Sequence, residues 1–281
     1  MFSILIPSWN NLPYLQLCIE SIIKNSKHKH QIIVHVNQGS DGTLEYLKQN
    51  NIDYTYSPEN IGICFAVNKA TTLAKGDYIV YMNDDMYVCP DWDEYILEEI
   101  KKLPDDNFMF SGTLIEPMNT GNPCVIHHDY GSDTKSFKEE ELLSSFDKYQ
   151  KNDWCGSAWP PTIVSKNRWT LVGGYSTELS PGMSSDDDFA MKMWHAGCRI
   201  FRGIAKSRIY HFQAKSTLRI KKNDGRKQFL QKWGINQSGF NKHYIKRGAL
   251  YEGPMSEPNE SIIKKEIRRG KLKTIWNTLK K

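Results

Sequence analysis

The stretch Gly76-Asp77-Tyr78-Ile79-Val80-Tyr81-Met82-Asn83-Asp84-Asp85 decides the fold, because it leads an apolar segment directly into an acidic turn. Residues 77–82 are mostly apolar and include good β-formers, which predicts a buried strand. The preceding residues 62–75 have helical spacing, and Gly76 is a helix stop signal. A helix that leads into a buried strand is the unit from which sheets with helices on both faces are built.

The rest of the first half repeats this unit. Apolar periodicity predicts strands at 2–7, 31–36 and 54–57 and helices at 12–24 and 43–49. Such alternation is typical of a parallel sheet, in which ligands bind beyond the carboxyl ends of the strands. Polar segments follow three of the predicted strands, at 8–10, 37–41 and 83–85. We therefore expect these three segments to meet at one crevice.

The second half is less regular. Residues 116–153 are expected to form a surface insertion beside the crevice, with an acidic helix at about 138–150. Ordered core is expected to return at 156–164 and 167–174, followed by a helix at 189–196 that ends at Gly197 and a strand at 199–204.

Composition narrows the class of protein. The net charge of +5 over 281 residues is mild, and the chain shows no recognisable nucleic-acid-binding module, so we expect no nucleic-acid partner. The six cysteines lie far apart without a Cys-x-x-Cys pair, which disfavours zinc and redox motifs and predicts buried thiols in a reduced, cytoplasmic protein. The first residues lack the pattern of a signal peptide, and no apolar run approaches the length of a membrane span.

The acidic turn itself predicts a metal site. Adjacent carboxylates such as Asp84 and Asp85 repel each other unless a cation or hydrogen bonds compensate them. A hard cation such as Mg²⁺ or Mn²⁺ takes oxygen ligands and commonly bridges a protein carboxylate to substrate phosphates. An Asp-rich turn that caps the next helix is the alternative interpretation.

Several motifs together resemble a known family. The segments Ser3–Asn10, Gly39–Thr43, Asn60–Gly62 and Gly76–Asp85 occur in order, and Gly173–Tyr175, Ser185–Phe189, Tyr210–His211 and Lys232–Gly234 continue the pattern. As an ordered set they closely resemble family-2 glycosyltransferases with the GT-A fold. The resemblance implies an α/β, Rossmann-like domain with a mixed, mostly parallel sheet flanked by helices. It implies a nucleotide-sugar-binding half at 1–115 and an acceptor-side half at 116–234. The resemblance ends at about residue 234, and the residues beyond it predict a helical, basic extension at 235–281.

The resemblance also implies an activity, namely an inverting, hexosyltransferase-type enzyme that moves a sugar from a nucleotide-sugar donor to a hydroxyl of a glycan or glycoconjugate. The donor-binding residues that it implies are Pro7, Ser8, Asn10, Asn37, Asn60, Gly62, Asn68, Asp84 and Asp85. A divalent metal, Mn²⁺ or Mg²⁺, is implied at Asp85 and His211, and the base at Asp186. Candidates for the acceptor side are Trp154, Trp159 and Asp187.

Two departures from the family leave alternatives open. The acidic pair that contacts the nucleobase in the family is Asn37-Gln38 here, so UDP is expected from family frequency but GDP and dTDP remain open. The glutamate expected before the base is Ser185, so Asp187 is a second candidate for the base. The basic residues Lys215, Arg219, Lys221 and Lys222 are candidates for a loop that closes over the diphosphate or, alternatively, for a solvated surface.

Two other functions compete with this one. A nucleotidyltransferase would normally carry a Gly-rich, basic loop after the first strand, where this chain has Ser8-Trp9-Asn10-Asn11. A non-catalytic nucleotide-sugar-binding module is disfavoured because Asp84, Asp85, Asp186 and His211 are retained.

The last residues predict a basic amphipathic helix. Its apolar positions are Ile262, Ile263, Ile267, Leu272, Ile275, Trp276 and Leu279, and its basic positions are Lys264, Lys265, Arg268, Arg269, Lys271, Lys273, Lys280 and Lys281. Such a helix suits peripheral contact with anionic lipid at the inner membrane face. The alternative is that the apolar positions dock on the protein's own core or on a second subunit. Gly270 weakens a continuous helix in either case.

Overall fold

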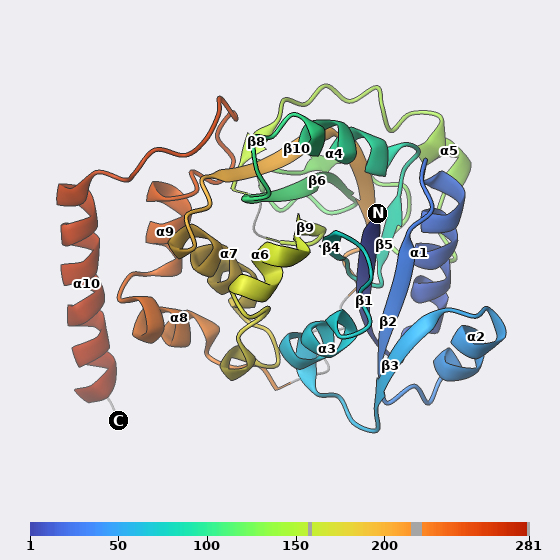
Figure 1. The fold of residues 1–281 in the computed structure, drawn as a ribbon, viewed down its shortest axis with the longest axis horizontal. Coiled ribbons are helices and arrows are strands. Elements are labelled where there is room, and N and C mark those ends of the chain that lie inside the picture. Colours follow the sequence, from blue (N-terminus) through green and yellow to red (C-terminus); the bar gives the residue numbers. More distant parts are fainter. Residues whose placement is uncertain (157–158, 215–220, 280–281) are drawn as a thin grey trace.

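The computed structural model describes residues 1–156, 159–214 and 221–279, with side chains up to residue 275. It shows one mixed sheet with helices packed on both faces (Figure 1). The strands are β1 Phe2–Trp9, β2 Gln31–Asn37, β3 Asp53–Ser57, β4 Tyr78–Tyr81, β5 Met86–Val88, β6 Phe108–Glu116, β7 Ile126–His127, β8 Trp154–Cys155, β9 Thr162–Ser165 and β10 Ile200–His211. The helices are α1 Leu12–Asn25, α2 Thr43–Gln49, α3 Gly62–Thr71, α4 Trp92–Lys101, α5 Glu139–Leu143, α6 Lys166–Leu171, the 3₁₀ turn η1 Thr177–Leu179, α7 Ser185–His195, α8 Gly225–Trp233, α9 Gln237–His243 and α10 Glu260–Leu279.

The sheet confirms the predicted α/β class. Its order is β3-β2-β1-β4-β9-β6-β10-β5, with β7 on β6 and β8 on β10. The first four strands are parallel, whereas β9 runs antiparallel to both of its neighbours. Alternate side chains of β1 point to opposite faces of the sheet and join different hydrophobic clusters. Ile4 and Ile6 belong to the cluster with α1 and α4, and Leu5 belongs to the cluster with α3 and α7. The parallel half therefore delivers the ends of β1, β2 and β4 to one edge, as predicted.

Two elements are shorter than predicted. Helix α3 ends at Thr71, because Leu73 and Ala74 bond to carbonyls three residues back and form a tight turn before Gly76. The acidic helix predicted at 138–150 is only α5, Glu139–Leu143. Beyond its end the Ser145 N–H bonds the Leu142 carbonyl three residues back, and the Ser145 hydroxyl donates to the Glu141 carbonyl and bonds the Tyr130 hydroxyl.

The predicted surface insertion has a core of its own. Tyr130 and Leu142 are fully buried and pack with Tyr87 and Tyr210 from the sheet. The Tyr210 hydroxyl also accepts the Tyr130 N–H at 3.1 Å, which ties the insertion to β10. Residues 116–153 therefore contribute buried core residues as well as surface.

Strand β10 and helix α7 extend furthest beyond their predicted bounds, and both extensions reach the site. Strand β10 continues past residue 204 to His211, because a bulge between Ile204 and Arg208 resets its register against β6. Pairing with β5 then places His211 opposite Met86, one residue after Asp85. Helix α7 begins at Ser185 instead of Phe189, so three aspartates occupy its first turn, where the helix dipole favours acidic residues.

The C-terminal residues pack against this domain. Phe240, Ile245 and Met255 are buried in the same core as α7. All six cysteines are buried and free, as predicted. Within residues 1–156, 159–214 and 221–279, no helix has both the length and the hydropathy needed to cross a bilayer.

Candidate active site

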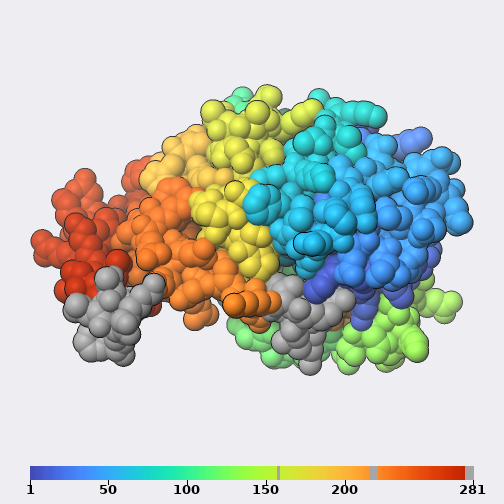
Figure 2. Space-filling model, turned by 90° about the horizontal axis from the view of Figure 1, so that it is seen from below, coloured from blue at the N-terminus to red at the C-terminus, as the bar shows by residue number. Residues whose placement is uncertain are grey.

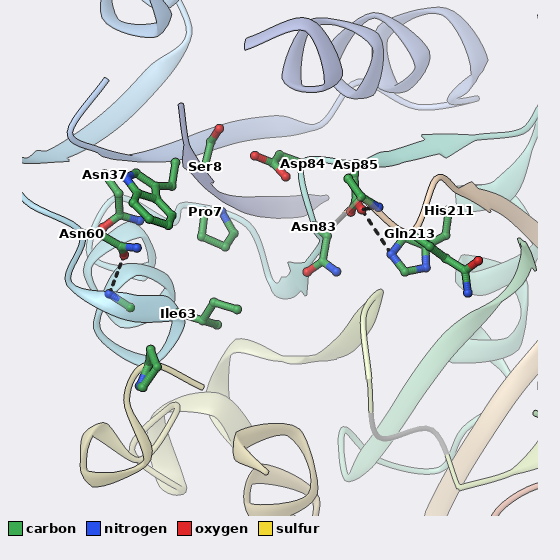
Figure 3. Close-up of a pocket in the computed structure, with 14 residues that line it drawn as sticks. Pro7, Ser8, Asn37, Asn60, Ile63, Asn83, Asp84, Asp85, His211 and Gln213 are labelled. Carbon is green, nitrogen blue, oxygen red and sulfur yellow. Dashed lines mark hydrogen bonds and ion pairs between the residues drawn. The ribbon is translucent and has the colours of Figure 1, made fainter. Parts of the chain in front are cut away.

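A pocket of about 370 Å³ lies at the carboxyl ends of β1, β2 and β4 (Figure 3). Of the predicted donor-side and metal residues it brings together Pro7, Ser8, Asn37, Asn60, Gly62, Asp84, Asp85 and His211. The Ser8 hydroxyl is buried here without a hydrogen-bond partner among the described residues, although buried polar groups are nearly always paired. A polar atom in this state, at the wall of a cavity, fits a site that receives a polar ligand.

Two predicted donor residues lie outside the pocket lining and position other groups. The Asn10 side chain accepts the Ser40 N–H at 2.9 Å and donates to Gln38, which holds the turn after β2. The Asn68 amide clamps the backbone of Tyr175, donating to its carbonyl at 2.7 Å and accepting its N–H at 2.8 Å.

The amide of Asn37 has a fixed orientation. Its Oδ1 accepts the Ile61 N–H at 3.0 Å and lies 3.3 Å from the Ser57 hydroxyl. A backbone N–H can only donate, so the oxygen of the amide must face Ile61. With Oδ1 held by Ile61, the Nδ2 group is the part of the amide that Asn37 can offer as a hydrogen-bond donor at the pocket wall.

At the other end of the pocket, Asp85 faces His211. Their Oδ2 and Nε2 atoms are 3.5 Å apart, and Asp85 Oδ2 also accepts the Ala214 N–H at 2.8 Å. Glu116 lies 2.8 Å from the other ring nitrogen, Nδ1, and Gln213 donates to Glu116 at 2.9 Å. Burial disfavours a charged imidazole, but the two carboxylates outweigh burial and raise the pKa of His211 to about 10.

Sequence reasoning missed Glu116 and Gln213. Glu116 ends β6, a strand that is buried along its whole length. A carboxylate at the end of a buried strand is a weaker signal than the paired carboxylates Asp84 and Asp85, because no recognisable motif surrounds it. Gln213 lies just beyond β10, in a stretch whose strand prediction stopped too early.

The three aspartates of α7 lie in three different environments. Asp186 is partly buried and accepts the Tyr175 hydroxyl at 2.9 Å. Burial and the neighbouring charge of Asp187 raise the pKa of Asp186 to about 7, because the bond from Tyr175 and the charge of Arg247 offset them only in part. Asp187 is buried, pairs with Arg247 and accepts a hydrogen bond from Gln237.

Asp188 is fully buried and accepts bonds from Trp233 at 2.8 Å, Lys232 at 2.9 Å and Ser176 at 2.5 Å. The Lys232-Trp233 motif thus ties α8 to α7. Among the three carboxylates, Asp186 has the fewest compensating partners.

The two tryptophans predicted on the acceptor side differ. Trp154 is buried and donates its indole N–H to Thr113 at 2.9 Å, so it belongs to the core. Trp159 is partly exposed, stacks on Trp154 with ring centres 5.9 Å apart, and carries the Arg247 guanidinium 4.5 Å from its ring centre.

Of the basic residues proposed as a closing loop, Lys215 and Arg219 lie outside the described residues. Lys221 lines a second cavity that shares Trp9, Asn60, Gly62 and Pro181 with the main pocket. Lys222 is exposed. Lys221 therefore lies beside the pocket, as the loop hypothesis expects.

The chain is similar to a known protein family. Residues 3–160 match the model of glycosyl transferase family 2. An uncharacterized glycosyltransferase of Haemophilus influenzae is 24% identical over 195 residues, which are 69% of this chain and 62% of that protein. Chondroitin synthase of Pasteurella multocida is 32% identical over 216 residues, which are 75% of this chain and only 21% of the synthase. The chain thus spans less than two thirds of each of these relatives.

Solved structures share the fold at low sequence identity. GalNAc-T7, crystallised with UDP, GalNAc and Mn²⁺, superposes with a TM-score of 0.60 at 15% identity, over 86% of this chain and 50% of that one. TarS of S. aureus superposes with a TM-score of 0.55 at 13% identity, over 82% of this chain and 39% of that one.

Proposed function

Because the chain belongs to glycosyltransferase family 2, we propose that it is an inverting, metal-assisted hexosyltransferase that moves a sugar from a UDP-sugar to a hydroxyl of a glycan or glycoconjugate. The observation that carries the proposal is the pocket at the strand ends, where the donor-side residues named from the sequence meet Asp85 and His211. The mechanism and the donor below are parts of this proposal.

The nucleotide end of the pocket suits a base that carries hydrogen-bond acceptors on its edge. Asn37 offers an amino group there, and the uracil carbonyls are acceptors that it could pair with. GalNAc-T7, which shares the fold, was crystallised with UDP. The unpartnered Ser8 hydroxyl supplies a second polar contact at the same wall.

The residues at the other end of the pocket could supply part of the ligand set of a divalent metal. Among the residues that the structure describes, no group of three or more His, Cys, Asp or Glu side chains converges in the way a metal cage needs. Asp85 and His211 would supply two ligands, and the diphosphate and water the others, as is usual for Mg²⁺. Glu116 would hold the second ring nitrogen, as outer carboxylates commonly do in such sites.

When bound, the metal would neutralise the charge that gathers on the departing diphosphate. His211 must give up its proton to become a ligand, because only the neutral imidazole binds a metal. Since Asp85 and Glu116 favour the protonated ring in the metal-free protein, metal affinity should rise with pH.

Asp186 is the proposed base. As the acceptor hydroxyl oxygen bonds to the anomeric carbon, its proton passes to the Asp186 carboxylate. The bond from the anomeric carbon to the diphosphate oxygen breaks, and its electron pair leaves with UDP. A carboxylate with a pKa near 7 suits a base that works near neutral pH.

A thermal-shift screen tests the donor. We expect UDP-sugars together with Mn²⁺ to raise the Tm, since a ligand at about 100 times its Kd stabilises the native state by about 2.7 kcal/mol. GDP-sugars and dTDP-sugars should raise it less, and Mn²⁺ alone should have little effect because two ligands bind it weakly. If no sugar nucleotide shifts the Tm with or without metal, the proposed donor site does not exist.

The C-terminal helix offers a contact with the membrane as part of the same proposal. Helix α10 lies at the end of the molecule opposite the N-terminal half (Figure 2). Ile263 and Ile267 turn inward, and Gly270 approaches α8 so closely that a Cβ there would lie 2.5 Å from the Gly234 carbonyl oxygen. The close approach explains the glycine, and the inward isoleucines match the alternative that the helix docks on its own core.

The outward side of α10 is basic, and its exposed residues are Lys264, Lys265, Arg268, Arg269, Lys271 and Lys273, with Leu272 and Ile275 among them. Each basic residue near anionic lipid contributes about 1 kcal/mol of attraction. We expect the full chain to co-sediment with anionic vesicles, less so in high salt, and not with neutral vesicles. The variant with Lys264, Lys265, Arg268 and Arg269 changed to Glu should stay in the supernatant, and equal pelleting of both proteins would exclude the contact.

A further inference from the structure

The C-terminal extension reaches into the site through one buried carboxylate. Asp187 pairs with Arg247, accepts a hydrogen bond from Gln237 and lies 3.5 Å from Asn241. All three partners lie beyond residue 234, where the resemblance to the family ends. Three contacts from one segment on a single carboxylate next to Asp186 indicate that the segment serves the site.

The backbone around Arg247 is pinned in place. The Arg247 N–H donates to the Asn241 carbonyl at 2.9 Å, and the Gly248 N–H donates to the Cys155 carbonyl at 3.0 Å. Gly156 has φ +89°, and a Cβ there would lie 2.6 Å from Arg247 Cα, so only glycine allows this approach. The guanidinium is thus held against α7 by contacts on both sides of the residue.

The same guanidinium touches the acceptor side. Its central carbon is 4.5 Å from the ring centre of Trp159, whose other neighbour is the buried Trp154. An arginine over an indole face is an attractive contact. Arg247 therefore connects Asp187, the neighbour of the proposed base, with the partly exposed tryptophan proposed for the acceptor.

We propose that Arg247 is a positioning residue of the transfer reaction: by pairing with Asp187 it leaves Asp186 as the carboxylate that accepts the proton, and it holds Trp159 beside that base. This inference rests on the proposed function. The physical reason is that two adjacent carboxylates cannot both stay ionised at low cost unless a cation compensates one of them. Arginine suits the task because it stays charged and its planar fork fits a carboxylate and an aromatic face together.

Removing the cation should make Asp186 harder to ionise. Among the residues that the structure describes, those that interact with Asp186 are Tyr175, Asp187, Arg247, Tyr81 and Cys64. Arg247 is the cation in this set, so without it the charge of Asp187 acts on Asp186 unopposed. Removing the Asp187 charge as well should cancel the effect, which a purely structural role for Arg247 would not do.

The experiment compares the wild type with Arg247→Met, Arg247→Lys and the double variant Asp187→Asn/Arg247→Met. Arg199→Met is the matched control, because Arg199 also stacks on a tryptophan and pairs with a carboxylate, at Trp194 and Glu257. The titration of Asp186 is followed by NMR of the ¹³C-labelled side-chain carboxyl, and UDP-sugar turnover is measured from pH 5 to pH 9.

We expect the Asp186 titration to move up by about one pH unit in Arg247→Met, and to return near the wild-type value in the double variant. The Asp186 titration of Arg247→Lys should lie between those of the wild type and Arg247→Met, and that of Arg199→Met should match the wild type. Turnover of Arg247→Met should fall about tenfold below pH 6 and change less above pH 8. An unshifted Asp186 titration in folded Arg247→Met, a shift in Arg247→Lys as large as that in Arg247→Met, or a double variant no closer to the wild type would overturn the proposal. If the wild type turns over no sugar nucleotide, the proposed function fails, while the NMR titration still decides the role of Arg247.

Discussion

Asp186→Asn is expected to lower sugar transfer by roughly 10²–10⁴-fold, the usual contribution of a general base, while donor binding stays intact. Asparagine keeps the size of the side chain and can still accept the hydrogen bond from the Tyr175 hydroxyl, but it cannot take up the acceptor's proton. Turnover of a UDP-sugar and calorimetric titration with UDP measure the two quantities separately. The Tm should not fall, because the substitution removes a partly buried charge whose ionisation the fold disfavours.

The pH dependence follows from the same carboxylate. A base must be ionised, so the wild-type rate should rise as pH increases through about 7, the pKa of Asp186 in the folded protein, and level off above it. The residual rate of Asp186→Asn should lack this rise.

Asp187→Asn is the matched control for the base. Asp187 is engaged by Arg247 and Gln237, so its loss should destabilise the fold and leave Arg247 without its partner, yet keep the proton acceptor. An inactive Asp187→Asn beside an active Asp186→Asn would show that the base has been assigned one residue too early.

Asp85→Ala is expected to weaken Mn²⁺-dependent UDP binding on the order of 10²-fold, because a metal clamp on a phosphoryl oxygen is worth several kcal/mol. Asp85 Oδ2 lies 3.5 Å from His211 Nε2, so the substitution removes the carboxylate on the Nε2 side of the ring, whereas Glu116 still holds Nδ1. Calorimetry with UDP, with and without Mn²⁺, measures both the affinity and its dependence on metal.

Two further variants interpret that result. Asp85→Asn keeps an oxygen for the Ala214 N–H but lowers the charge, so it should lose metal dependence with little change in fold. Asp77→Asn, at the exposed start of the same chain segment, should bind as the wild type does. Equal UDP affinity and equal response to Mn²⁺ in Asp85→Ala would rule out a metal site at this residue.

The fold could be predicted from the sequence because its first half obeys local rules. β1, β2 and β4 are short apolar runs ended by polar residues, and parallel pairing then brings those ends together. The errors came where tertiary contacts override local pattern. A bulge carries β10 to His211, and the predicted acidic helix ends at Leu143, just before Ser145 bonds the Tyr130 hydroxyl of the insertion's own core.

The site could be predicted only as far as motifs reach. Asp84, Asp85 and His211 meet in the pocket as expected, whereas Glu116 joins them from a strand with no motif. Arg247 could not be predicted from spacing, because its partner Asp187 lies 60 residues away and the contact depends on Gly156 accommodating the chain.

The central claim is tested most directly by proton NMR of α-linked UDP-sugars incubated with the wild type, Mn²⁺ and a panel of mono- and disaccharide acceptors. The account predicts loss of the donor's anomeric signal and first appearance of a β-anomeric signal in the product, with neither change in Asp186→Asn. An α-anomeric product would contradict the inverting mechanism, and a donor signal unchanged for every UDP-sugar would contradict the proposed transfer itself.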